Sequence, residues 1–504
     1  MLPNLNRETL ASRAIEADHT PLHDGPINIL QIGDGNFLRG FVDWMIDVCN
    51  EQGQFQGRVA VAQPLSRGIA DKINAQDGLY TVLLRGIENG QSVERRRVIS
   101  CVKTGLNPYA QWNEMLALAT SADLRFVISN TTEAGIADVE EAYTPGEAQQ
   151  SFPAKIAALL HARYAACNGD KNAGLVFLPC ELIEANGTNL KRIVLEHAKR
   201  WGFEVGFSEW VESCNYFLNT LVDRIVPGFP AAEADALATA FGYRDDLLVA
   251  AEPFHLWVIE GPQHLADEFP LHKAGLNVVW TEDMRPYRTR KVRILNGAHT
   301  ASALAAYSAG LDTVKEMVDD PVVSKYLNQV MFAEIVPFVP LPEAERQSYA
   351  NTIMERFGNP FIRHELISIA LNSVSKWQVR VLPTVKDYIA ANGKAPAGLA
   401  FSLAALLHFY RGQSNGAGAY FGSRNGQDYP IKDDALALEI LDAAWKTFDP
   451  AQPQALVASV LADARLWGED LTALADLAAQ VARHLGNIEQ RGVSKAISEL
   501  FLTC

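Results

Sequence analysis

The chain has 504 residues, of which 48% are hydrophobic, and carries a formal net charge of −15 at pH 7. A chain of this length and composition can bury more than one hydrophobic core, so we expect two or three domains. The acidic balance argues against a nucleic-acid-binding protein and against a protein that binds anionic membranes, because both usually present a basic surface. The oligomeric state stays open.

The six cysteines are scattered along the chain, without C-x-x-C pairs or histidine partners at zinc-binding spacing. This pattern is typical of reduced thiols in a cytoplasmic protein, and no metal site is expected. The N-terminus lacks a basic region followed by an apolar run, and the longest apolar stretch, at 399–407, is too short to span a bilayer. The sequence therefore predicts a cytoplasmic location without membrane attachment.

The first predicted strand is the β-branched run 27–32, which a glycine-containing turn follows; the apolar spacing after the turn predicts a helix. Strand, glycine turn and helix in this order hold the pyrophosphate of a nucleotide, because glycines let the backbone approach closely and free N–H groups at the helix start face the negative charge. A tight turn without a ligand is the alternative, since Leu38 stands where a third glycine is usual. The residues predicted to bind a dinucleotide here are Gly33, Asp34, Gly35, Asn36, Phe37, Leu38 and Arg39.

Further β-patterned runs alternate with helical patterns, which indicates a mostly parallel sheet. These runs are 58–62, 126–129, 175–178 and 276–280. Between two more runs, at 79–84 and 96–102, Asn89-Gly90 predicts a hairpin turn. We expect this antiparallel insertion to lie on the edge of the sheet.

Two polar clusters directly follow predicted strands, at 130–133 and 179–181. Ligands of such sheets bind beyond the carboxyl ends of the strands. Asn130, Thr131 and Glu133 are therefore candidate cofactor contacts. Polar loops that cap helix ends would have a similar composition, so that alternative stays open.

After residue 284 the strand patterns give way to long helical periodicities, such as 314–339, 398–411 and 455–481. A segment rich in Gly, Ser and Asn, at 412–427, is expected to be flexible. The predicted fold class is α/β. A Rossmann-type, mostly parallel sheet domain at 1–284, with the hairpin insertion, precedes a mainly α-helical catalytic domain at 285–504.

The stretch 291–299 places an amine, an amide and an imidazole on one predicted helix, those of Lys291, Asn296 and His299. In an α-helix Asn296 lies about 140° and His299 about 80° round from Lys291, so the three share one side. A secondary alcohol that loses a hydride needs a base for its proton and a donor that holds the developing alkoxide. The three are therefore candidate catalytic residues that need no metal. A solvated basic helix face that ends at Asn296-Gly297 is the alternative.

The chain resembles the polyol-specific long-chain dehydrogenases, or mannitol dehydrogenase family, whose members join a Rossmann domain to a helical C-terminal domain with a K-x-x-x-x-N-x-x-H motif. Lys291, Asn296 and His299 match that motif. The resemblance implies a metal-independent dehydrogenase of a CH–OH group, with Lys291 as general acid/base. It spans most of the chain, through residues 33–39, 130–135, 222–225, 252–254, 257–259, 359–360, 376 and 382–384.

Within the family the chain is most similar to the altronate oxidoreductases, through contiguous strings at 33–39, 41–44, 76–81, 129–136, 179–183 and 294–300. This similarity implies NAD-dependent interconversion of D-altronate and D-tagaturonate in hexuronate breakdown, with an aldonate or ketouronate as substrate. The alternatives are a fructuronate reductase that acts on mannonate, a mannitol-type polyol dehydrogenase, and a nucleotide-binding sensor without turnover.

Departures from the family pattern bear on the substrate. Arg288 stands where mannitol dehydrogenases have a glutamate, three residues before the lysine, and a guanidinium can hold a carboxylate through paired hydrogen bonds. Arg288 is therefore predicted to bind the uronate carboxylate, and Lys376, which matches a substrate-binding lysine of the family, is a second candidate. Ser368 replaces a family arginine eight residues before Lys376, and Leu182 replaces an asparagine of the oxyanion pocket.

The preference for NAD over NADP rests on the resemblance alone. A dinucleotide fold that prefers NAD often has an acid at the end of its second strand, which binds the ribose hydroxyls. Here the segment 62–67 contains no acid, and Ser66 and Arg67 could accept a 2′-phosphate. NAD is the expected cofactor, and NADP is not excluded.

Overall fold

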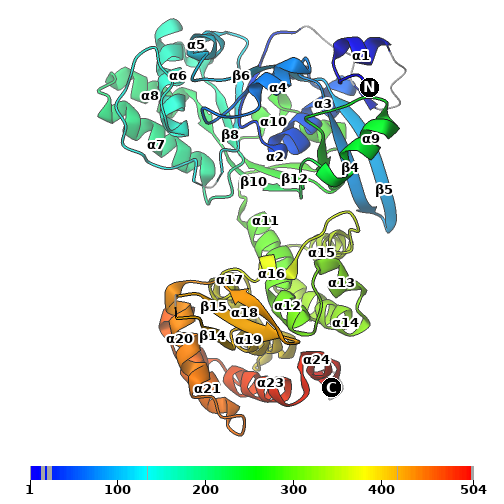
Figure 1. Ribbon diagram of the computed structural model, residues 1–504. Coiled ribbons are helices and arrows are strands. Elements are labelled where there is room, and N and C mark those ends of the chain that lie inside the picture. The colour runs from blue at the N-terminus through cyan, green and yellow to red at the C-terminus, as the bar shows by residue number, and fades with distance from the viewer. Residues whose placement is uncertain (1, 13–17, 20–24, 133, 417, 501–504) are drawn as a thin grey trace. The chain divides into compact units, whose positions relative to one another are not determined.

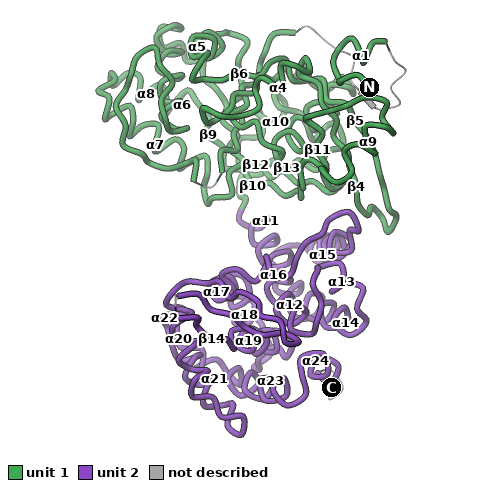
Figure 2. The backbone as a smooth tube through the Cα atoms, in the orientation of Figure 1, with its two compact units in different colours: residues 1–284 green, residues 285–504 purple. Residues whose placement is uncertain are grey.

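The structure of the chain is a computed structural model, which describes residues 2–12, 18–19, 25–132, 134–416 and 418–500. The chain divides into two units, residues 1–284 and 285–504 (Figure 2). No helix within the described ranges is both long and apolar enough to cross a membrane.

Unit 1 (1–284) is built round a six-stranded sheet in the order β6-β3-β2-β7-β8-β9 (Figure 1). All neighbouring strands in it are parallel. Numbered along the chain, this is the 3-2-1-4-5-6 order of a Rossmann domain, in which the strand order reverses between β2 and β7. The predicted Rossmann-type sheet is therefore confirmed. Its strands are β2 (Ile29–Ile32), β3 (Val59–Ala62), β6 (Val102–Leu106), β7 (Phe126–Ser129), β8 (Val176–Pro179) and β9 (Tyr216–Phe217).

The strands of this sheet bury alternate side chains on two faces, as a sheet covered on both sides requires. Ile29, Val59 and Ile128 pack on one face with α3. Leu30 and Phe177 pack on the other face with α5 to α8. The helices of unit 1 are α1 (Arg7–Ser12), α2 (Asn36–Leu38), α3 (Trp44–Glu51), α4 (Ala70–Ala75), α5 (Trp112–Thr120), α6 (Phe152–Ala166), α7 (Asn186–Arg200), α8 (Val205–Cys214), α9 (Ala234–Phe241) and α10 (His264–Glu268), with the π-helical η1 (Arg39–Asp43) and the short 3₁₀ turns η2 (Lys171–Ala173), η3 (Ala231–Glu233) and η4 (Leu271–Ala274).

The predicted hairpin is formed by β4 (Tyr80–Glu88) and β5 (Gln91–Ile99). Asn89 and Gly90 have φ angles of 54° and 74°, the left-handed pair that a two-residue type I′ turn needs. Its expected place on the edge of the parallel sheet was wrong, because β6 takes that edge and the hairpin belongs to a separate sheet, β1-β5-β4-β11. The partner strands are β1 (Asp18–His19) and β11 (Val249–Ala251).

A third sheet of unit 1 has the order β10-β12-β13. It contains the predicted strand 276–280, observed as β13 (Val278–Thr281), so this run lies outside the parallel Rossmann sheet. The other two strands are β10 (Asn219–Asp223) and β12 (Leu256–Glu260).

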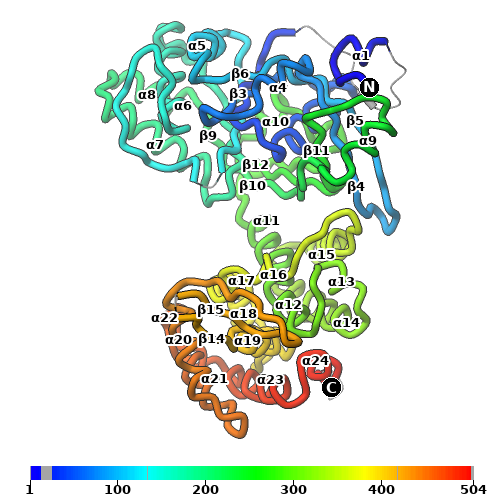
Figure 3. The backbone as a smooth tube through the Cα atoms, viewed as in Figure 1, coloured from blue at the N-terminus to red at the C-terminus, as the bar shows by residue number. Residues whose placement is uncertain are grey.

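Unit 2 (285–504) is mainly helical, as predicted (Figure 1). Figure 3 follows its chain from the green α11 to the red α24, and α19 packs on both α12 and α23. Its helices are α11 (Arg285–Arg290), α12 (Gly297–Ser308), α13 (Val314–Asp319), α14 (Pro321–Gln329), α15 (Glu343–Phe357), α16 (Leu366–Ile369), α17 (Ser373–Arg380), α18 (Leu382–Asn392), α19 (Ala397–Phe409), α20 (Ala435–Lys446), α21 (Pro453–Leu461), α22 (Ala464–Trp467), α23 (Leu477–Arg491) and α24 (Val493–Leu500). The π-helical η5 (Lys291–Asn296) and η6 (Val330–Ile335) and the 3₁₀ turns η7 (Val336–Phe338) and η8 (Leu471–Ala473) complete it.

Two long helical predictions in unit 2 are interrupted in the structure. The pattern 314–339 breaks at Asp320, whose carboxylate caps α14 while Pro321 starts it. The pattern 455–481 breaks first between α21 and α22, where the Asp463 carboxylate caps α22. It breaks again after α22, where Gly468 has a φ of 79° and ends the helix in the left-handed conformation. Asp320-Pro321 and Gly468 are local signals of a helix start and a helix end, which apolar periodicity alone does not take into account.

The segment 412–427 was wrongly expected to be flexible. It is mostly ordered as the antiparallel strands β14 (Gly412–Ser414), β15 (Tyr420–Arg424) and the start of β16 (Gln427–Ile431), while residue 417 lies outside the described residues. Gly422 lies against Tyr429, where an added Cβ would come within 2.2 Å of the Tyr429 ring. Gly422 therefore allows the two strands to pack closely at this position.

Candidate functional site

The glycine turn of unit 1 joins β2 to a helix at the point where the strand order reverses. Gly33 has a φ of +132°, and a Cβ there would stand 2.7 Å from the carbonyl oxygen of Asn130. Gly35 has a φ of −70° with open space around it, and α2, η1 and α3 then run without interruption from Asn36 to Glu51. Gly33 therefore permits the fold of the turn, whereas Gly35 leaves room for an outside group to approach the backbone.

The predicted contacts after Gly35 divide into exposed and buried residues. Asn36 is exposed, and Asp34 and Phe37 are half-buried. Leu38 is buried beneath Gly33. Arg39 is only 4% exposed, and its guanidinium binds Asn36 Oδ1 at 2.7 Å and the carbonyl oxygen of Leu247. The structure thus places Arg39 inside the unit, where it fixes the helix start.

A polar chain lies beneath the turn. Gln31 of β2 donates from Nε2 to the carbonyl oxygen of Gly33 at 3.1 Å and lies 3.4 Å from the carboxylate of Asp43. The hydroxyl of Tyr80 donates to the same carboxylate at 2.7 Å. Complete burial raises the pKa of Asp43 to about 7. The support of the glycine turn therefore includes a carboxyl group that titrates near neutral pH.

The two polar clusters after β7 and β8 meet at Glu181. Its buried carboxylate accepts hydrogen bonds from the backbone N–H and the hydroxyl of Thr131, each at 2.9 Å, and from the hydroxyl of Ser129 at 3.1 Å. Asn130 donates to the carbonyl oxygen of Cys180 at 3.0 Å. Burial raises the pKa of Glu181. The cluster is a rigid support at the carboxyl ends of the strands, and the predicted contact Glu133 lies outside the described residues.

The loop after β3 reaches the glycine turn through Asp34, whose Oδ2 accepts the backbone N–H of Ile69 at 2.7 Å. Gln63 holds the inside of this loop by donating to the carbonyl oxygens of Leu65 and Ser66 at 3.0 and 3.1 Å. Ser66 and Arg67 are exposed. The loop that would meet the ribose of a dinucleotide therefore presents a hydroxyl and a guanidinium to solvent.

In unit 2 the candidate catalytic residues lie on a continuous helical stretch, in which η5 (Lys291–Asn296) joins α11 to α12. Its π-helical hydrogen bonds run from i to i+5, so Asn296 comes about one turn after Lys291. The α-helical spacing of about 140° assumed for this pair was therefore wrong, and the π-helix brings the amide closer to the side of the amine. Single π-helical turns of this kind are frequent at functional sites.

His299 is held rigidly on α12. It is 9% exposed and stacks on Phe357 with ring centroids 4.1 Å apart and planes 10° apart, while His364 meets its edge. Its pKa is lowered well below the usual range by burial and then by the positive groups of His364, Arg356, Arg380 and Lys376. His299 is therefore neutral near pH 7. Its buried Nε2 has no hydrogen-bond partner among the described residues, which leaves that atom for a substrate oxygen.

The residues predicted to bind the substrate lie on two helices of unit 2. Arg288 is in α11, half-buried and one turn before Lys291. Lys376 is in α17, and its ammonium donates to the carbonyl oxygen of Ile369 at 3.0 Å. Burial and then the nearby Arg380 lower the pKa of Lys376, although Asp433 opposes them. The structure therefore groups Lys376 with His299.

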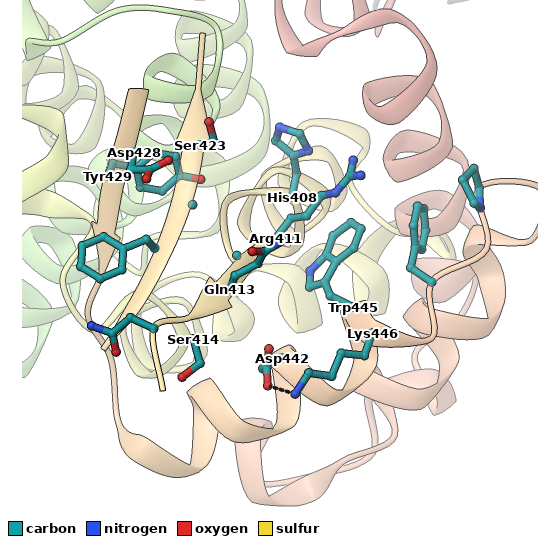
Figure 4. A pocket seen from close by; sticks show the side chains of 16 residues that line it. His408, Arg411, Gln413, Ser414, Ser423, Asp428, Tyr429, Asp442, Trp445 and Lys446 are labelled. Carbon is teal, nitrogen blue, oxygen red and sulfur yellow. Dashed lines mark ion pairs between the residues drawn. The ribbon is translucent and has the colours of Figure 1, made fainter. Parts of the chain in front are cut away.

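A large cavity of about 1040 Å³ lies elsewhere in unit 2, between the small β-sheet and α20 (Figure 4). None of the predicted catalytic residues lines it. Two of its cations are already paired, since Lys446 bonds Asp442 at 2.7 Å and Arg411 bonds Glu489, which also bonds His408. The cavity therefore offers an outside anion little uncompensated charge.

Two family models match the chain. The mannitol dehydrogenase Rossmann domain matches residues 27–273, and the mannitol dehydrogenase C-terminal domain matches residues 283–489. The chain belongs to the mannitol dehydrogenase family. The resemblance seen in the sequence is thus confirmed, and the two matches fall in the two units.

Relatives in this family are similar over almost the whole chain. An altronate oxidoreductase of Yersinia pestis bv. Antiqua is 44% identical, covering 95% of this chain and 98% of the relative. Those of Halalkalibacterium halodurans and Bacillus subtilis are 43% and 41% identical, each covering 94% of this chain, and 93% and 95% of the relatives.

Two solved structures share the fold of this chain. Mannitol 2-dehydrogenase of Pseudomonas fluorescens, in a ternary complex with NAD and D-mannitol, is 23% identical with a TM-score of 0.69 and covers 99% of both chains. A substrate-free D-sorbitol dehydrogenase is also 23% identical, with a TM-score of 0.78, covering 98% of this chain and 100% of its own.

The family motif in the sequence did not reveal every group near His299. Arg356, His364 and Arg380 all act on its imidazole, and only the fold brings them there. The one sequence signal for Arg380 is its position four residues after Lys376, which puts both on one side of a helix. Leu182, which stands in place of the family asparagine, is 60% exposed on unit 1.

Proposed function

We propose that this member of the mannitol dehydrogenase family is an NAD-dependent oxidoreductase that interconverts D-altronate and D-tagaturonate in hexuronate breakdown. The main observation behind this proposal is His299, which follows Lys291 and Asn296 on one helical stretch. Its buried imidazole is neutral, and its Nε2 has no hydrogen-bond partner among the described residues. The similarity to altronate oxidoreductases over at least 94% of the chain supports the substrate. We also expect the enzyme to act in the cytoplasm.

The residues of unit 1 fit a dinucleotide. The Gly33 turn lies at the switch point of the sheet, and the backbone of Gly35 and Asn36 is open at the start of a helix. These N–H groups would hold the pyrophosphate, with Asp34, Asn130 and Thr131 lining the neighbouring loops. When bound, NAD supplies a ring that accepts a hydride from the carbinol carbon. The exposed Ser66 and Arg67 keep NADP open as a second cofactor.

Within unit 2 each catalytic residue has a separate task. Lys291 takes the proton from the substrate hydroxyl, and it returns a proton to the carbonyl oxygen in the reverse direction. The side-chain amide of Asn296 donates a hydrogen bond to the same oxygen as negative charge develops on it. His299 orients the oxygen through Nε2 and, being neutral, leaves the proton transfer to Lys291. No residue of this set needs a metal ion for these steps.

Two cations of unit 2 are assigned to the substrate carboxylate, Arg288 and Lys376. Arg288 offers a planar fork one turn before the proposed base, and Lys376 offers a point charge near His299. A neutral polyol has no carboxylate for either cation to bind. The charge of these two residues therefore favours a sugar acid over mannitol.

The test is an initial-rate assay of the purified full-length chain with D-altronate, D-mannonate and D-mannitol, each with NAD and NADP, and with D-tagaturonate and D-fructuronate in the reductive direction. We expect the largest kcat/KM for altronate and tagaturonate with the NAD couple. A preference for mannonate and fructuronate would identify a fructuronate reductase, and a preference for mannitol a polyol dehydrogenase. Cofactor binding without turnover of any substrate would identify a sensor. Each of these three outcomes contradicts the proposal.

A further inference from the structure

Two cations of α17, Lys376 and Arg380, lie one helical turn apart and so share one side of the helix. Both are half-buried. Arg380 has one hydrogen bond, from Nη1 to the hydroxyl of Thr300 at a long 3.5 Å, and Lys376 has the bond to Ile369. Within the described ranges neither side chain forms an ion pair with a carboxylate. Burial lowers the pKa of Arg380.

Other arginines of unit 2 have their charge compensated by an ion pair within the chain. Each of six pairs with a carboxylate: Arg293, Arg363, Arg411, Arg424, Arg465 and Arg491. The acid that acts on Lys376, Asp433, is itself engaged by the backbone N–H of Val374 and the hydroxyl of Tyr410. Two like charges on adjacent turns disfavour the helix, and a desolvated cation is costly without a partner. This pair therefore indicates that its counter-charge comes from outside the chain.

The cation pair adjoins the candidate catalytic histidine. Thr300, which Arg380 contacts, directly follows His299 on α12. Both Arg380 and Lys376 act on the imidazole of His299, after burial, His364 and Arg356. An anion held by the pair would thus lie close to the oxygen that His299 orients. A sugar acid has this arrangement, with a carboxylate a few bonds from its reacting carbon.

We propose that Arg380 forms, with Lys376, the subsite that binds the carboxylate of an aldonate or ketouronate, and that this pair sets the preference for sugar acids over neutral polyols. The inference rests on the proposed function, which places the reacting carbon at Lys291, Asn296 and His299. The guanidinium of Arg380 supplies two parallel N–H donors to the carboxylate, and Lys376 adds a point charge. Arg288, on α11, then contributes less to the recognition of the carboxylate.

The experiment compares Arg380→Gln and Arg380→Lys with a control, Arg483→Gln, which removes the same charge from an exposed position of α23. Calorimetry on the full-length chain measures Kd for D-altronate and for its neutral counterpart D-altritol, and initial rates give kcat and KM. We expect Arg380→Gln to weaken altronate binding by about 10- to 100-fold, because a hydrogen-bonded charge pair is lost. Altritol binding should change by less than about twofold, and Arg380→Lys should fall between.

The subsite would be overturned by equal weakening for both ligands, by an Arg380→Gln variant that binds altronate as the control does, or by a wild-type chain that binds neither ligand. A selective loss for altronate in Arg288→Gln alone would also overturn it and place the carboxylate at α11. The proposed function fails separately. If the wild type binds altronate through Arg380 but turns it over with neither nicotinamide cofactor, the subsite is retained and the oxidoreductase assignment is not.

Discussion

The two candidate sites differ in which of their polar groups the fold leaves unsatisfied. Around the glycine turn of unit 1, Asp34 binds the N–H of Ile69, Arg39 binds Asn36, and Glu181 binds Thr131. In unit 2, Nε2 of His299 has no partner among the described residues and Arg380 has no carboxylate. Among the described residues unit 1 also has unpartnered buried atoms, Oε1 of Gln31 and Oδ1 of Asp43, but they lie in the support beneath the turn. The difference teaches that unit 1 presents a backbone surface, whereas unit 2 leaves a polar atom of a candidate catalytic residue for its ligand.

This contrast separates the expected effects of substitutions in the two units. Changes at the turn of unit 1 should alter folding and cofactor binding together, because the same contacts serve both. Changes at the unsatisfied groups of unit 2 should alter activity with little cost in stability, since those groups stabilise the fold weakly.

The largest effect is expected from Lys291→Ala, which removes the proposed base. We expect kcat to fall by about 10²- to 10⁴-fold, because proton transfer by a positioned group contributes that much. NAD binding, followed by quenching of tryptophan fluorescence, should be unchanged, since the predicted cofactor residues lie in unit 1. The matched control is Lys315→Ala on α13, a lysine that pairs with Asp319 on the surface. A Lys291→Ala variant as active as this control would contradict the assignment.

The next effect distinguishes the two glycines of the turn. Gly33→Ala places a Cβ 2.7 Å from the carbonyl oxygen of Asn130 at a φ of +132°, so we expect a loss of about 2–3 kcal/mol in the free energy of unfolding together with weaker NAD binding. Gly35→Ala meets open space at a φ of −70°, so folding should be unaffected and only NAD binding should weaken. Thermal unfolding and fluorescence titration measure both. Equal stability of the two variants would show that Gly33 is not a constrained position.

How far the sequence predicts these sites depends on whether the signal is local. The strand 27–32, its glycine turn and the Lys291 motif are contiguous, so residue types and spacing revealed them before any fold was known. The place of the hairpin depended on β6 taking the sheet edge, which no local pattern encodes. Likewise α-helical spacing missed the π-helix at 291–296, because its altered hydrogen bonds depend on packing in unit 2.

Arg380 shows a stricter limit on what can be predicted from the sequence. Arg380 is a candidate binding residue because no carboxylate pairs with it within the described part of unit 2. Whether a side chain has such a partner depends on tertiary contacts, which a local sequence pattern does not show. Arg39 shows the reverse case. The sequence predicted it as a cofactor contact beside two glycines, but its guanidinium is buried against the carbonyl oxygen of Leu247, more than two hundred residues away.

A smaller effect is expected from His299→Leu, which tests directly whether the unpartnered Nε2 of this residue serves the substrate. Leucine keeps an apolar contact with Phe357 and removes a buried nitrogen without a partner, so the free energy of unfolding should stay equal or rise. The value of kcat/KM for altronate should fall by about 10- to 30-fold, since one hydrogen bond to the reacting oxygen is lost. Thermal unfolding and initial rates check both parts. A large loss of stability would show that His299 serves the fold of α12 first.

The smallest effect concerns pH and the support of the glycine turn. Burial raises the pKa of Asp43 to about 7, despite the opposing bonds from Tyr80 and Gln31 and the charge of Arg39, while the charge of Asp47 adds to the rise. A carboxyl whose folded pKa lies above its unfolded value stabilises the fold while protonated, and this stability is lost as the pH rises through about 7. Between pH 6 and 8 the wild type should therefore lose about 1 kcal/mol through this group.

Asp43→Asn should remove that dependence, because the amide reproduces the protonated acid. Oδ1 of Asp43 and Oε1 of Gln31 both have no partner among the described residues, so the NH₂ group of the asparagine can replace a carboxylate oxygen that accepts no hydrogen bond. The control is Glu334→Gln in unit 2, where the pKa is also raised to about 7 but the carboxylate accepts two backbone N–H groups, those of Gly398 and Leu399. A glutamine must turn its NH₂ group toward one of them, so this variant should lose stability at both pH values. Thermal unfolding curves of Asp43→Asn that shift with pH in parallel with the wild type would show that Asp43 does not titrate in this range.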